Sequence, residues 1–331
     1  MTPKILIVRL SSIGDIIQGL GVPTALTAKF PGAETHWLTK REFSFLIRSH
    51  PSVKRVIEFD TRDGFIELLR LALRLRNQQY THLYDAHGSL RSWVVSTILR
   101  LRVNPPKFIR RSKERLRRLL FFWFRLKTVV QPYLGQHSYL KPLEPWLGDV
   151  RVPPAPQLFI PPEAMESATL KLGDLSPFVA LVPSAAWKMK CWPIAHWKTL
   201  IETLSEQRFI VLGGPEDHFC EELENLSPAR VKNMAGKLSL IESCAVLKLA
   251  SLTVAADTGL MHAADQLGAP TLALIGPTAF GYPTRKTSRV IEVGMPCRPC
   301  SKDGSGSCSQ SVYQKCMVEI SPRKVAEFIE Q

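Results

Sequence analysis

The chain has 331 residues, enough for two α/β domains that each bury a core of their own. Hydrophobic residues make up 45% of it and charged residues 22%, a composition that fits a folded globular protein and excludes a disordered one. The formal net charge of +14 indicates an anionic partner: nucleic acid, an acidic membrane surface or a phosphorylated substrate.

The first half alternates short apolar runs with segments of helical periodicity. We expect strands at 5–8, 35–38, 53–59 and 82–86, and helices at 16–30, 62–76 and 90–101. This alternation predicts a parallel sheet covered by helices on both faces. The apolar run at the start is too short for a signal peptide, and no later window approaches the roughly 20 apolar residues of a spanning helix. We therefore expect the protein in the cytoplasm.

The small residues Ser11, Ser12 and Gly14 lie between the first strand and its helix, where they allow the backbone to approach a ligand closely. Asp15 follows in the first helical turn, a position from which a carboxylate can act as a general base. The alternative is that Asp15 only caps the helix and complements its dipole. A GxGxxG turn is absent, which argues against a nicotinamide enzyme, and a P-loop is absent too.

Many basic and aromatic residues lie between residues 110 and 127. The basic ones are Arg110, Arg111, Lys113, Arg115, Arg117, Arg118, Arg125 and Lys127. Leu116, Leu119, Leu120, Trp123 and Phe124 follow a helical spacing among them. This pattern is typical of a helix that lies on an anionic bilayer. A solvated helix face and a core helix rimmed by arginines are the alternatives.

Proline density rises between residues 151 and 162, which predicts a semi-rigid linker. We place the boundary there, with one domain at 1–155 and another at 156–331. In the second domain we expect strands at 178–182, 209–212, 252–256 and 271–275, and helices at 194–205, 217–226, 240–250, 262–267 and 325–329. Two such sheets would leave a cleft, with ligands beyond the carboxyl ends of the strands.

Three loops of the second domain follow its expected strands and carry polar residues. Lys188 and Lys190 come after the first strand, close to Ser184, and two lysines there could neutralise a diphosphate leaving group. Glu216 and Asp217 follow a glycine turn, where a carboxylate binds ribose hydroxyls or caps a helix.

The third loop, 257–262, begins with Asp257 and enters a helix. Thr258 and Gly259 would offer hydroxyl and N–H donors to a phosphate at the helix N-terminus. Asp257 would bind sugar hydroxyls or position the loop, because a carboxylate is repelled by phosphate. Met261 and His262 lie within the first turn, where His262 is either a binding residue or a histidine hydrogen-bonded in the core.

Four of the seven cysteines gather near the C-terminus: Cys297, Cys300, Cys308 and Cys316. In a cytosolic protein such a cluster favours a metal site over disulfides, although its spacing matches no common zinc pattern. A structural zinc site, a disulfide and unliganded thiols are all open interpretations.

Together these motifs resemble glycosyltransferase family 9, the bacterial lipopolysaccharide heptosyltransferases. The resemblance extends over nearly the whole chain, through KILIVRLSSIGDII, YDAHGSLRS, WKMKCWP, LGGPED, AADTGLMHAADQLGAPTLALIGPT and the CRPC cluster. It implies a GT-B architecture, in which two Rossmann-like domains face each other across a cleft. It also implies ADP-heptose as donor, an inner-core lipopolysaccharide acceptor and inversion at the anomeric carbon.

The resemblance implies roles for particular residues. Asp15 becomes the general base, Lys190 faces the donor phosphates, and Asp217, in preference to Glu216, holds the ribose. The remaining donor residues are Ser184, Lys188, Asp257, Thr258, Gly259, Met261 and His262, and the acceptor residues are Ser11, Ser12, Gly14, His87, Arg91, Arg110 and Arg111. His87 departs from the family pattern, where glutamine is expected, and the spacing leaves open whether Lys188 or Lys190 meets the diphosphate.

The partners that follow are a nucleotide sugar, an anionic glycolipid and the inner leaflet of the bacterial inner membrane, to which the enzyme would bind peripherally. We expect no cofactor for catalysis. A non-catalytic nucleotide-sugar-binding protein, or a relative that transfers another sugar, is the alternative. We do not expect nucleic acid as a partner, because the basic segment lacks a recognition helix and an aromatic stacking platform.

Overall fold

The computed structural model describes residues 2–331, which divide into two compact units. Unit 1 comprises residues 2–115 and 136–159, and unit 2 comprises residues 116–135 and 160–331. The last change of unit follows Phe159, inside the proline-rich segment that was expected as a linker. The grouping of residues 116–135 with unit 2 was not expected from the sequence.

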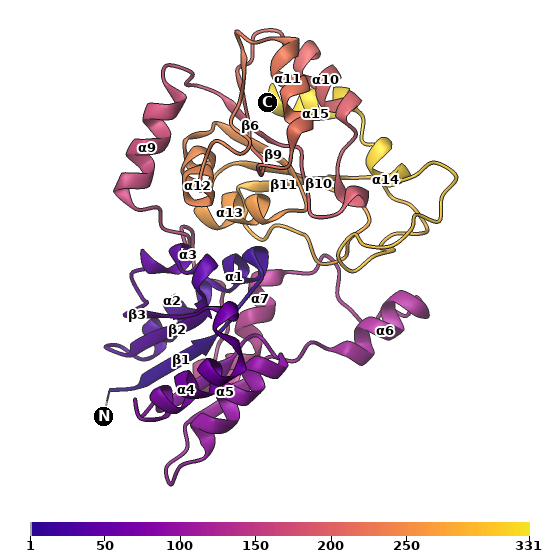
Figure 1. Ribbon diagram of the computed structural model, residues 1–331. Helices are drawn as coiled ribbons and strands as arrows, with labels where there is room; N and C mark the ends of the chain where they lie inside the picture. Colours follow the sequence, from indigo (N-terminus) through magenta and orange to yellow (C-terminus); the bar gives the residue numbers. More distant parts are fainter. Residues whose placement is uncertain (1) are drawn as a thin grey trace. The chain divides into compact units, whose positions relative to one another are not determined.

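Unit 1 is a five-stranded, all-parallel sheet with strand order β3-β2-β1-β4-β5 (Figure 1). Its strands are β1 Lys4–Val8, β2 Glu34–Lys40, β3 Arg55–Phe59, β4 His82–Asp85 and β5 Lys107–Arg110. Its helices are α1 Ile13–Gly19, α2 Gly21–Lys29, α3 Phe45–Arg48, α4 Gly64–Arg76, α5 Leu90–Arg100, α7 Gly135–Leu140 and α8 Glu144–Leu147. Short 3-10 turns are η1 Arg41–Phe43, η2 Thr61–Asp63 and η3 Lys141–Leu143.

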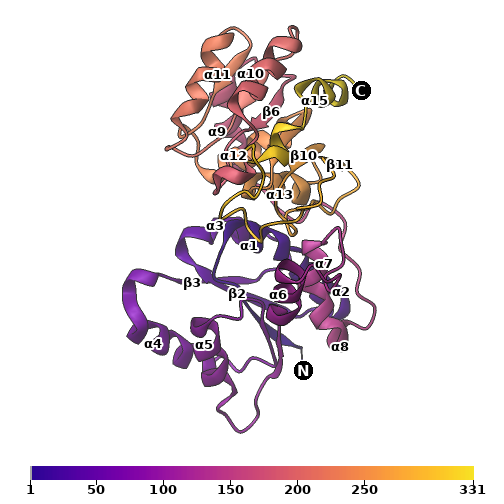
Figure 2. The ribbon, with the colours of Figure 1, turned by 90° about the vertical axis from the view of Figure 1, so that its right-hand side faces the viewer.

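Strand β1 is central in this sheet and buried on both faces. Leu6 and Val8 pack with Leu68 of α4 and Val95 of α5 on one face, and Figure 2 shows α2, α7 and α8 on the other. Because helices cover both faces, the sequence of β1 is a continuous apolar run and does not alternate apolar with polar residues. This is why the sequence located it correctly.

Unit 2 contains a six-stranded, all-parallel sheet with strand order β11-β10-β9-β6-β7-β8. Its strands are β6 Val179–Val182, β7 Phe209–Val211, β8 Val231–Asn233, β9 Leu252–Ala256, β10 Thr271–Ile275 and β11 Ser288–Glu292. Its helices are α6 Arg115–Trp123, α9 Pro162–Leu172, α10 Ile194–Thr203, α11 Glu221–Leu226, α12 Leu240–Leu249, α13 Gly259–Leu267, α14 Lys315–Val318 and α15 Pro322–Ile329, with 3-10 turns η4 Lys188–Lys190 and η5 His218–Cys220.

The core of unit 2 lies between its sheet and the group α10, α11 and α15, which Figure 1 shows together on one side. Trp197 of α10 is fully buried there beside Val179 and Leu181 of β6. Helix α12 packs against both α9 and α13 in the same unit. The two covered faces match the α/β class expected from the sequence.

Two expected helices differ in the structure. The helix expected at 16–30 is split at Leu20 into α1 and α2. Pro23 explains the break, since it has no N–H to bond the carbonyl of Gly19 in a continuous helix, whereas it is tolerated in the first turn of α2. The helix expected at 217–226 begins as the 3-10 turn η5 and becomes α-helical only at Glu221. Among residues 2–331, no helix combines the length and apolar character needed to cross a bilayer.

Candidate active site

Strands β1 and β4 of unit 1 form a topological switch point. From β1 the chain adds β2 and β3 on one side and later adds β4 and β5 on the other. The loops that leave β1 and β4 therefore diverge, which opens room for a ligand beyond the carboxyl ends of the strands. Asp15 follows β1, and His87 follows β4.

The Asp15 carboxylate is held by three side chains and is still 43% exposed. Its Oδ2 pairs with Arg9 Nη2 at 2.5 Å and accepts a hydrogen bond from Ser12 Oγ at 3.0 Å. Its Oδ1 accepts a hydrogen bond from Tyr139 Oη at 2.8 Å. Arg9 is buried and also donates from Nη1 to the carbonyl of Ala86 at 2.9 Å, so it links the loop after β1 to the loop after β4.

These contacts keep Asp15 ionised. Burial alone would raise the pKa of its carboxyl, but the charge of Arg9 and the hydrogen bonds from Tyr139 and Ser12 outweigh burial and lower the pKa below the usual value. Burial and the Asp15 charge raise the pKa of the Tyr139 phenol, so Tyr139 stays a donor. An ionised, partly exposed carboxylate at a strand end has a lone pair that can accept a proton, and the lowered pKa makes it a weaker base than a free aspartate.

The loop after β4 is shaped by a buried carboxylate, Asp85. Its Oδ1 accepts hydrogen bonds from the backbone N–H groups of His87 and Gly88 at 3.1 and 2.9 Å. Its Oδ2 accepts from Ser92 Oγ at 3.2 Å and from Arg110 Nε at 2.8 Å. Asp85 therefore fixes where His87 lies, a structural role that the sequence analysis missed.

His87 lines a pocket of about 460 Å³ in unit 1. Burial, followed by the nearby charges of Arg9 and Lys113, lowers the pKa of His87 to about 4, so its ring is neutral near pH 7. Its Nδ1 is buried, and no residue in the range 2–331 satisfies it. The pocket is lined by Phe59, Thr61, Gly64, Phe65, Leu68, His87, Ser89, Leu90 and Arg91.

Only some of the predicted acceptor residues line the pocket beside His87. Arg91 lines the pocket together with His87. Arg110 pairs with Asp85, and Arg111 donates to the carbonyl and hydroxyl of Ser138 at 3.1 and 2.9 Å. Ser12 hydrogen-bonds to Asp15, while Ser11 and Gly14 lie in the same turn, half-buried.

The arginines also order the surroundings of Asp15. The guanidinium of Arg111 lies 4.0 Å from the centre of the Tyr139 ring. Tyr84 Oη donates to the carbonyl of Tyr139 at 2.7 Å. Arg110 thus contacts Asp85, and Arg111 contacts Tyr139, inside unit 1. Binding of an acceptor by either arginine would come in addition to these contacts.

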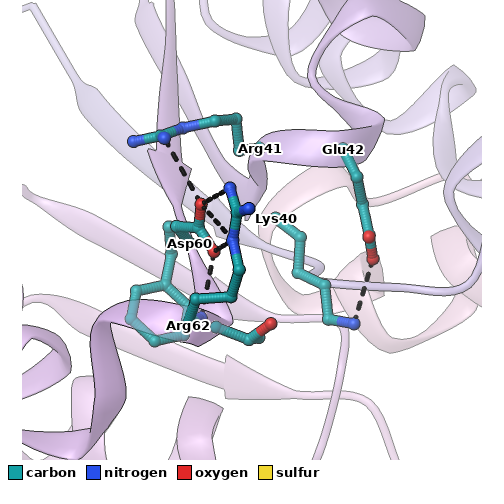
Figure 3. A pocket seen from close by; sticks show the side chains of 7 residues that line it. Lys40, Arg41, Glu42, Asp60 and Arg62 are labelled. Carbon is teal, nitrogen blue, oxygen red and sulfur yellow. Dashed lines mark hydrogen bonds and ion pairs between the residues drawn. The ribbon is translucent and has the colours of Figure 1, made fainter.

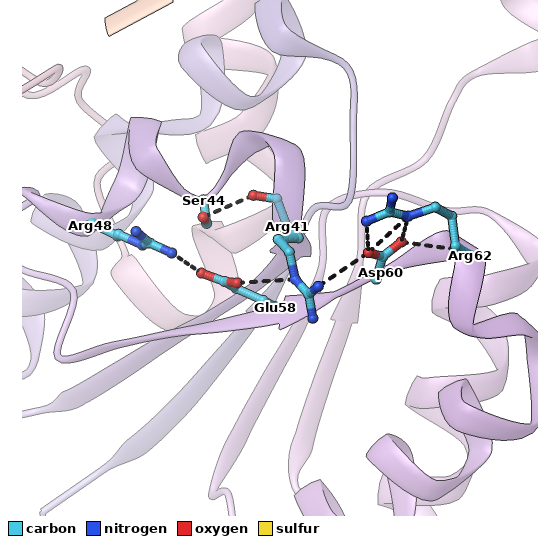
Figure 4. A network of polar contacts seen from close by, with 6 residues as sticks. All are labelled: Arg41, Ser44, Arg48, Glu58, Asp60 and Arg62. Atoms are coloured by element: carbon cyan, nitrogen blue, oxygen red, sulfur yellow. Dashed lines mark hydrogen bonds and ion pairs between the residues drawn. The ribbon is translucent and has the colours of Figure 1, made fainter.

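A second pocket of about 420 Å³ lies where β2 and β3 end (Figure 3). Asp60 accepts hydrogen bonds from Arg62 Nη2 at 2.6 Å and from Arg41 Nη1 at 3.3 Å, and the hydrogen bonds from Arg62 hold the pKa of Asp60 far below its usual range. Arg48 pairs with Glu58 next to it (Figure 4). The sequence analysis did not single out this cluster. Its acidic and basic groups pair with one another.

In unit 2 the switch point lies between β6 and β9. From β6 the chain adds β7 and β8 on one side, and β9, β10 and β11 follow on the other. Lys190 follows β6 and Asp257 follows β9, and the two side chains meet with Lys190 Nζ 3.3 Å from Asp257 Oδ2. The structure thus brings together two residues that the sequence placed 67 positions apart.

Asp257 is the hub of this cluster and is buried. Its Oδ2 also accepts from Thr278 Oγ1 at 2.7 Å, and its Oδ1 lies 3.6 Å from His262 Nε2. Burial would raise the pKa of the carboxyl, but His262, Lys190 and Thr278 outweigh burial and hold the pKa far below its usual value. These contacts tie Asp257 to three neighbouring side chains, and its role, in sugar binding or in positioning the loop, stays a prediction.

Lys188 and Lys190 differ in their surroundings. The Lys190 side chain is only 11% exposed and is paired with Asp257, whereas Lys188 is exposed, with its ammonium 6.0 Å from the centre of the Tyr313 ring. The Asp257 contact places Lys190, and not Lys188, at the edge formed by β6 and β9. This geometry favours Lys190 for the diphosphate.

Two glycines pack against this pair. A Cβ on Gly281 would overlap the carboxylate of Asp257, and a Cβ on Gly304 would overlap the Cγ of Lys190. Gly304 also has a φ of +91°, which other residues adopt at a cost. Both positions accept only glycine without rearrangement, and neither was identified from the sequence.

Helix α13 begins directly beyond Asp257. Thr258 is its N-cap residue, extended at φ −143° and ψ 167°, with no cap bond from its own side chain. The first N–H groups of the helix, beginning at Gly259, therefore point toward the strand end, as an anion-binding N-terminus requires. Met261 and His262 are buried in the first turn.

The remaining predicted donor residues lie on the neighbouring loops. Asp217 Oδ2 accepts a hydrogen bond from the backbone N–H of Gly214 at 2.6 Å, which closes its own turn, and Glu216 is exposed. Ser184 is half-buried just after β6. Of the two carboxylates, Glu216 has the more accessible side chain.

The four clustered cysteines are free thiols. Burial and the neighbouring thiols raise the pKa of Cys300, and burial raises the pKa of Cys316 to about 11. Within residues 2–331, no three His, Cys, Asp or Glu side chains are grouped closely enough to hold a metal ion. As placed, the thiols do not form a zinc site, and zinc at Cys297, Cys300, Cys308 and Cys316 stays a prediction.

Each unit thus presents the carboxyl edge of an open parallel sheet, one with an accessible carboxylate and one with a cation beside a helix N-terminus. This is the architecture of the GT-B class of glycosyltransferases. The model of glycosyltransferase family 9 (heptosyltransferase) matches residues 68–313, and the chain belongs to this family. It is therefore a glycosyltransferase.

Known proteins are similar to this chain over its full length. Lipopolysaccharide heptosyltransferase 1 of Pseudomonas aeruginosa is 26% identical, covering 99% of this chain and 97% of that protein. The solved E. coli ADP-heptose lps heptosyltransferase II has a TM-score of 0.75 at 21% identity, covering 99% and 97%. E. coli heptosyltransferase WaaC with ADP-2-deoxy-2-fluoro heptose has a TM-score of 0.69 at 21% identity, covering 99% of each chain.

Proposed function

We propose that this enzyme transfers a heptose from ADP-heptose to the inner core of a lipid A-based lipopolysaccharide acceptor, with inversion at the anomeric carbon. The observation that carries the proposal is the half-exposed, ionised Asp15 at the switch point of unit 1. Support for the donor comes from relatives whose names specify heptose transfer.

In the proposed reaction Asp15 withdraws the proton of the acceptor hydroxyl while that oxygen attacks the anomeric carbon. The Oδ2 atom already contacts Arg9 and Ser12, whereas Oδ1 receives only the Tyr139 hydrogen bond from these partners. A carboxylate oxygen has two lone pairs. We therefore assign proton acceptance to the second lone pair of Oδ1.

On the donor side, Lys190 and the first N–H groups of α13 compensate the charge that develops on the departing ADP. In this proposal the ammonium of Lys190 shifts its interaction from Asp257 toward the diphosphate, and Asp257 keeps the loop in place. Glu216 or Asp217 holds the ribose. No metal ion is assigned a part in this scheme, and unchanged activity in a chelator would support that assignment.

The 460 Å³ pocket beside His87 is assigned to the acceptor. The exposed ring of Phe65 gives a flat apolar surface for a sugar ring, and Arg91 supplies a positive charge. These groups suit an acidic saccharide. The acceptor is lipid-linked, so we also propose that the enzyme works in the cytoplasm at the inner face of the inner membrane.

Incubation of the purified protein with ADP-heptose and a purified inner-core acceptor, followed by mass spectrometry, tests the proposal. We expect the acceptor mass to rise by one heptose and ADP to be released. Matched reactions with other nucleotide sugars test the alternative that a different sugar is transferred. Transfer of another sugar in preference to heptose, or release of ADP without any glycosylated product, would contradict the proposal.

A further inference from the structure

Helix α6 and the chain that follows it present an apolar surface with positive charge around it. Six large apolar side chains in residues 116–130 are between 48% and 83% exposed. We call them the α6 surface: Leu116, Leu119, Trp123, Phe124, Leu126 and Val130. We propose that the α6 surface inserts into the headgroup region of an anionic lipid bilayer and holds the enzyme on the membrane.

The opposite side of α6 is anchored to its own unit. Phe122 and Tyr133 both contact the ring of Phe280, with centroids 6.0 and 4.8 Å apart, and the Arg118 guanidinium lies 4.2 Å from the centre of that ring. Arg125 Nη1 donates to the carbonyl of Pro299 at 2.6 Å. The helix is therefore fixed by one face.

Helical geometry separates the anchored face from the α6 surface. Leu116, Leu119 and Trp123 are spaced i, i+3, i+7 and share one side, while Arg118 and Phe122 are spaced i, i+4 and lie on the other. Trp123 is 82% exposed, although an exposed tryptophan in water is unfavourable without a partner. The exposed face therefore has the amphipathic form of an interfacial helix.

The positive charge of this segment favours an anionic membrane as the partner of the α6 surface. Between Arg115 and Leu134 the sequence has five basic residues and no acidic one. A second copy of a chain with net charge +14 would be repelled there, whereas a layer of anionic headgroups would attract it. Aliphatic side chains outnumber aromatic ones in the α6 surface, which fits acyl chains better than stacked bases.

The inference rests on the proposed function only for the reason to bind a membrane, because a lipid-linked acceptor has to be reached there. The test of membrane binding does not depend on the proposed function. Sedimentation with phosphatidylglycerol-containing vesicles measures binding directly, with pure phosphatidylcholine vesicles as the reference. We expect the wild-type protein to prefer the anionic vesicles and to lose much of its binding as salt screens the charges.

Two variants test the α6 surface with matched controls elsewhere. Trp123→Ser should weaken binding to anionic vesicles about tenfold, whereas Trp93→Ser, an exposed tryptophan on α5, should leave binding within about twofold. Lys127→Glu should also weaken binding, and Lys248→Glu on α12 should not. The Lys127 variant changes an exposed side chain only, so it remains informative if the Trp123 variant folds poorly.

Transfer assays separate this inference from the proposed function. Trp123→Ser should slow transfer to an acceptor embedded in vesicles and leave transfer to a lipid-free saccharide acceptor unchanged. If wild type transfers no heptose to either acceptor, the proposed function fails while vesicle binding is still measured. Equal vesicle binding by wild type and Trp123→Ser, equal slowing with both acceptors, or preferential binding to RNA would overturn the membrane assignment.

Discussion

The two sheets share the strand order around their switch points, but their aspartates have different surroundings. In unit 1 Asp15 lies beside the β1–β4 switch point with 43% of its side chain exposed, and in unit 2 Asp257 lies beside the β6–β9 switch point with 12% exposed. Asp15 keeps an accessible oxygen, whereas Asp257 is enclosed by Lys190, Thr278 and His262. This difference in exposure is why we propose Asp15 as the base and Asp257 as a residue that positions its loop.

The largest expected effect is on Asp15. Replacing it with asparagine removes the proton acceptor and should lower kcat about 100-fold or more, with donor affinity nearly unchanged. Steady-state kinetics with ADP-heptose measure both quantities. Asp149→Asn, at an exposed carboxylate elsewhere in unit 1, is the control and should behave as wild type. Wild-type turnover by the Asp15 variant would remove this residue from the mechanism.

The matching change in unit 2 should mainly affect stability. Asp257→Asn leaves the buried ammonium of Lys190 without its counter-charge and should lower the free energy of unfolding by about 2 kcal/mol. It should also weaken ADP binding, because the loop before α13 is less well held. Thermal unfolding with and without ADP measures both effects, and unchanged values in both would show that Asp257 is not an anchor.

The two lysines allow a test of position within unit 2. Lys190→Ala should lower kcat/KM for the donor about tenfold or more, because a cation beside the diphosphate is lost. Lys188→Ala, which removes an exposed lysine of the same loop, should change it less than about twofold. A reversed order of the two effects would assign the diphosphate to Lys188.

The smallest expected effect concerns the pH dependence. The hydrogen bond from Tyr139 favours the ionised form of Asp15, so Tyr139→Phe should raise the pKa of Asp15. As pH falls, activity would then be lost at a higher pH than in wild type, in a profile of kcat/KM against pH. Tyr282→Phe, which removes a hydroxyl bonded to Glu292 in unit 2, should leave this acid limb in place.

The sequence located the central strands well because their burial on both faces produces continuous apolar runs. It missed β5, β8 and β11, which are all at the edges of their sheets. These three strands each contain a partly exposed or exposed residue, as in Lys107–Arg110, so no continuous apolar run marks them. The assignment of residues 116–135 to unit 2 depends on contacts with Phe280, far along the chain, and local patterns contain no such information.

The candidate site was predictable only in part, for a similar reason. Turn residues after strands pointed to Asp15, Lys190 and Asp257, since position in the chain fixes which edge they occupy. The partners of those residues come from distant segments. Tyr139 reaches Asp15 from α7, and Thr278 reaches Asp257 from beyond β10, so pairing and exposure required the folded structure.

A crossed comparison of two variants separates the roles of Asp15 and Asp257. ADP affinity by calorimetry and kcat with a saturating acceptor would be measured for Asp15→Asn and Asp257→Asn side by side. We expect Asp15→Asn to lose kcat while keeping ADP affinity, and Asp257→Asn to lose ADP affinity and stability. If Asp15→Asn instead kept kcat, or lost ADP affinity as Asp257→Asn does, the assignment of the base to unit 1 would be contradicted.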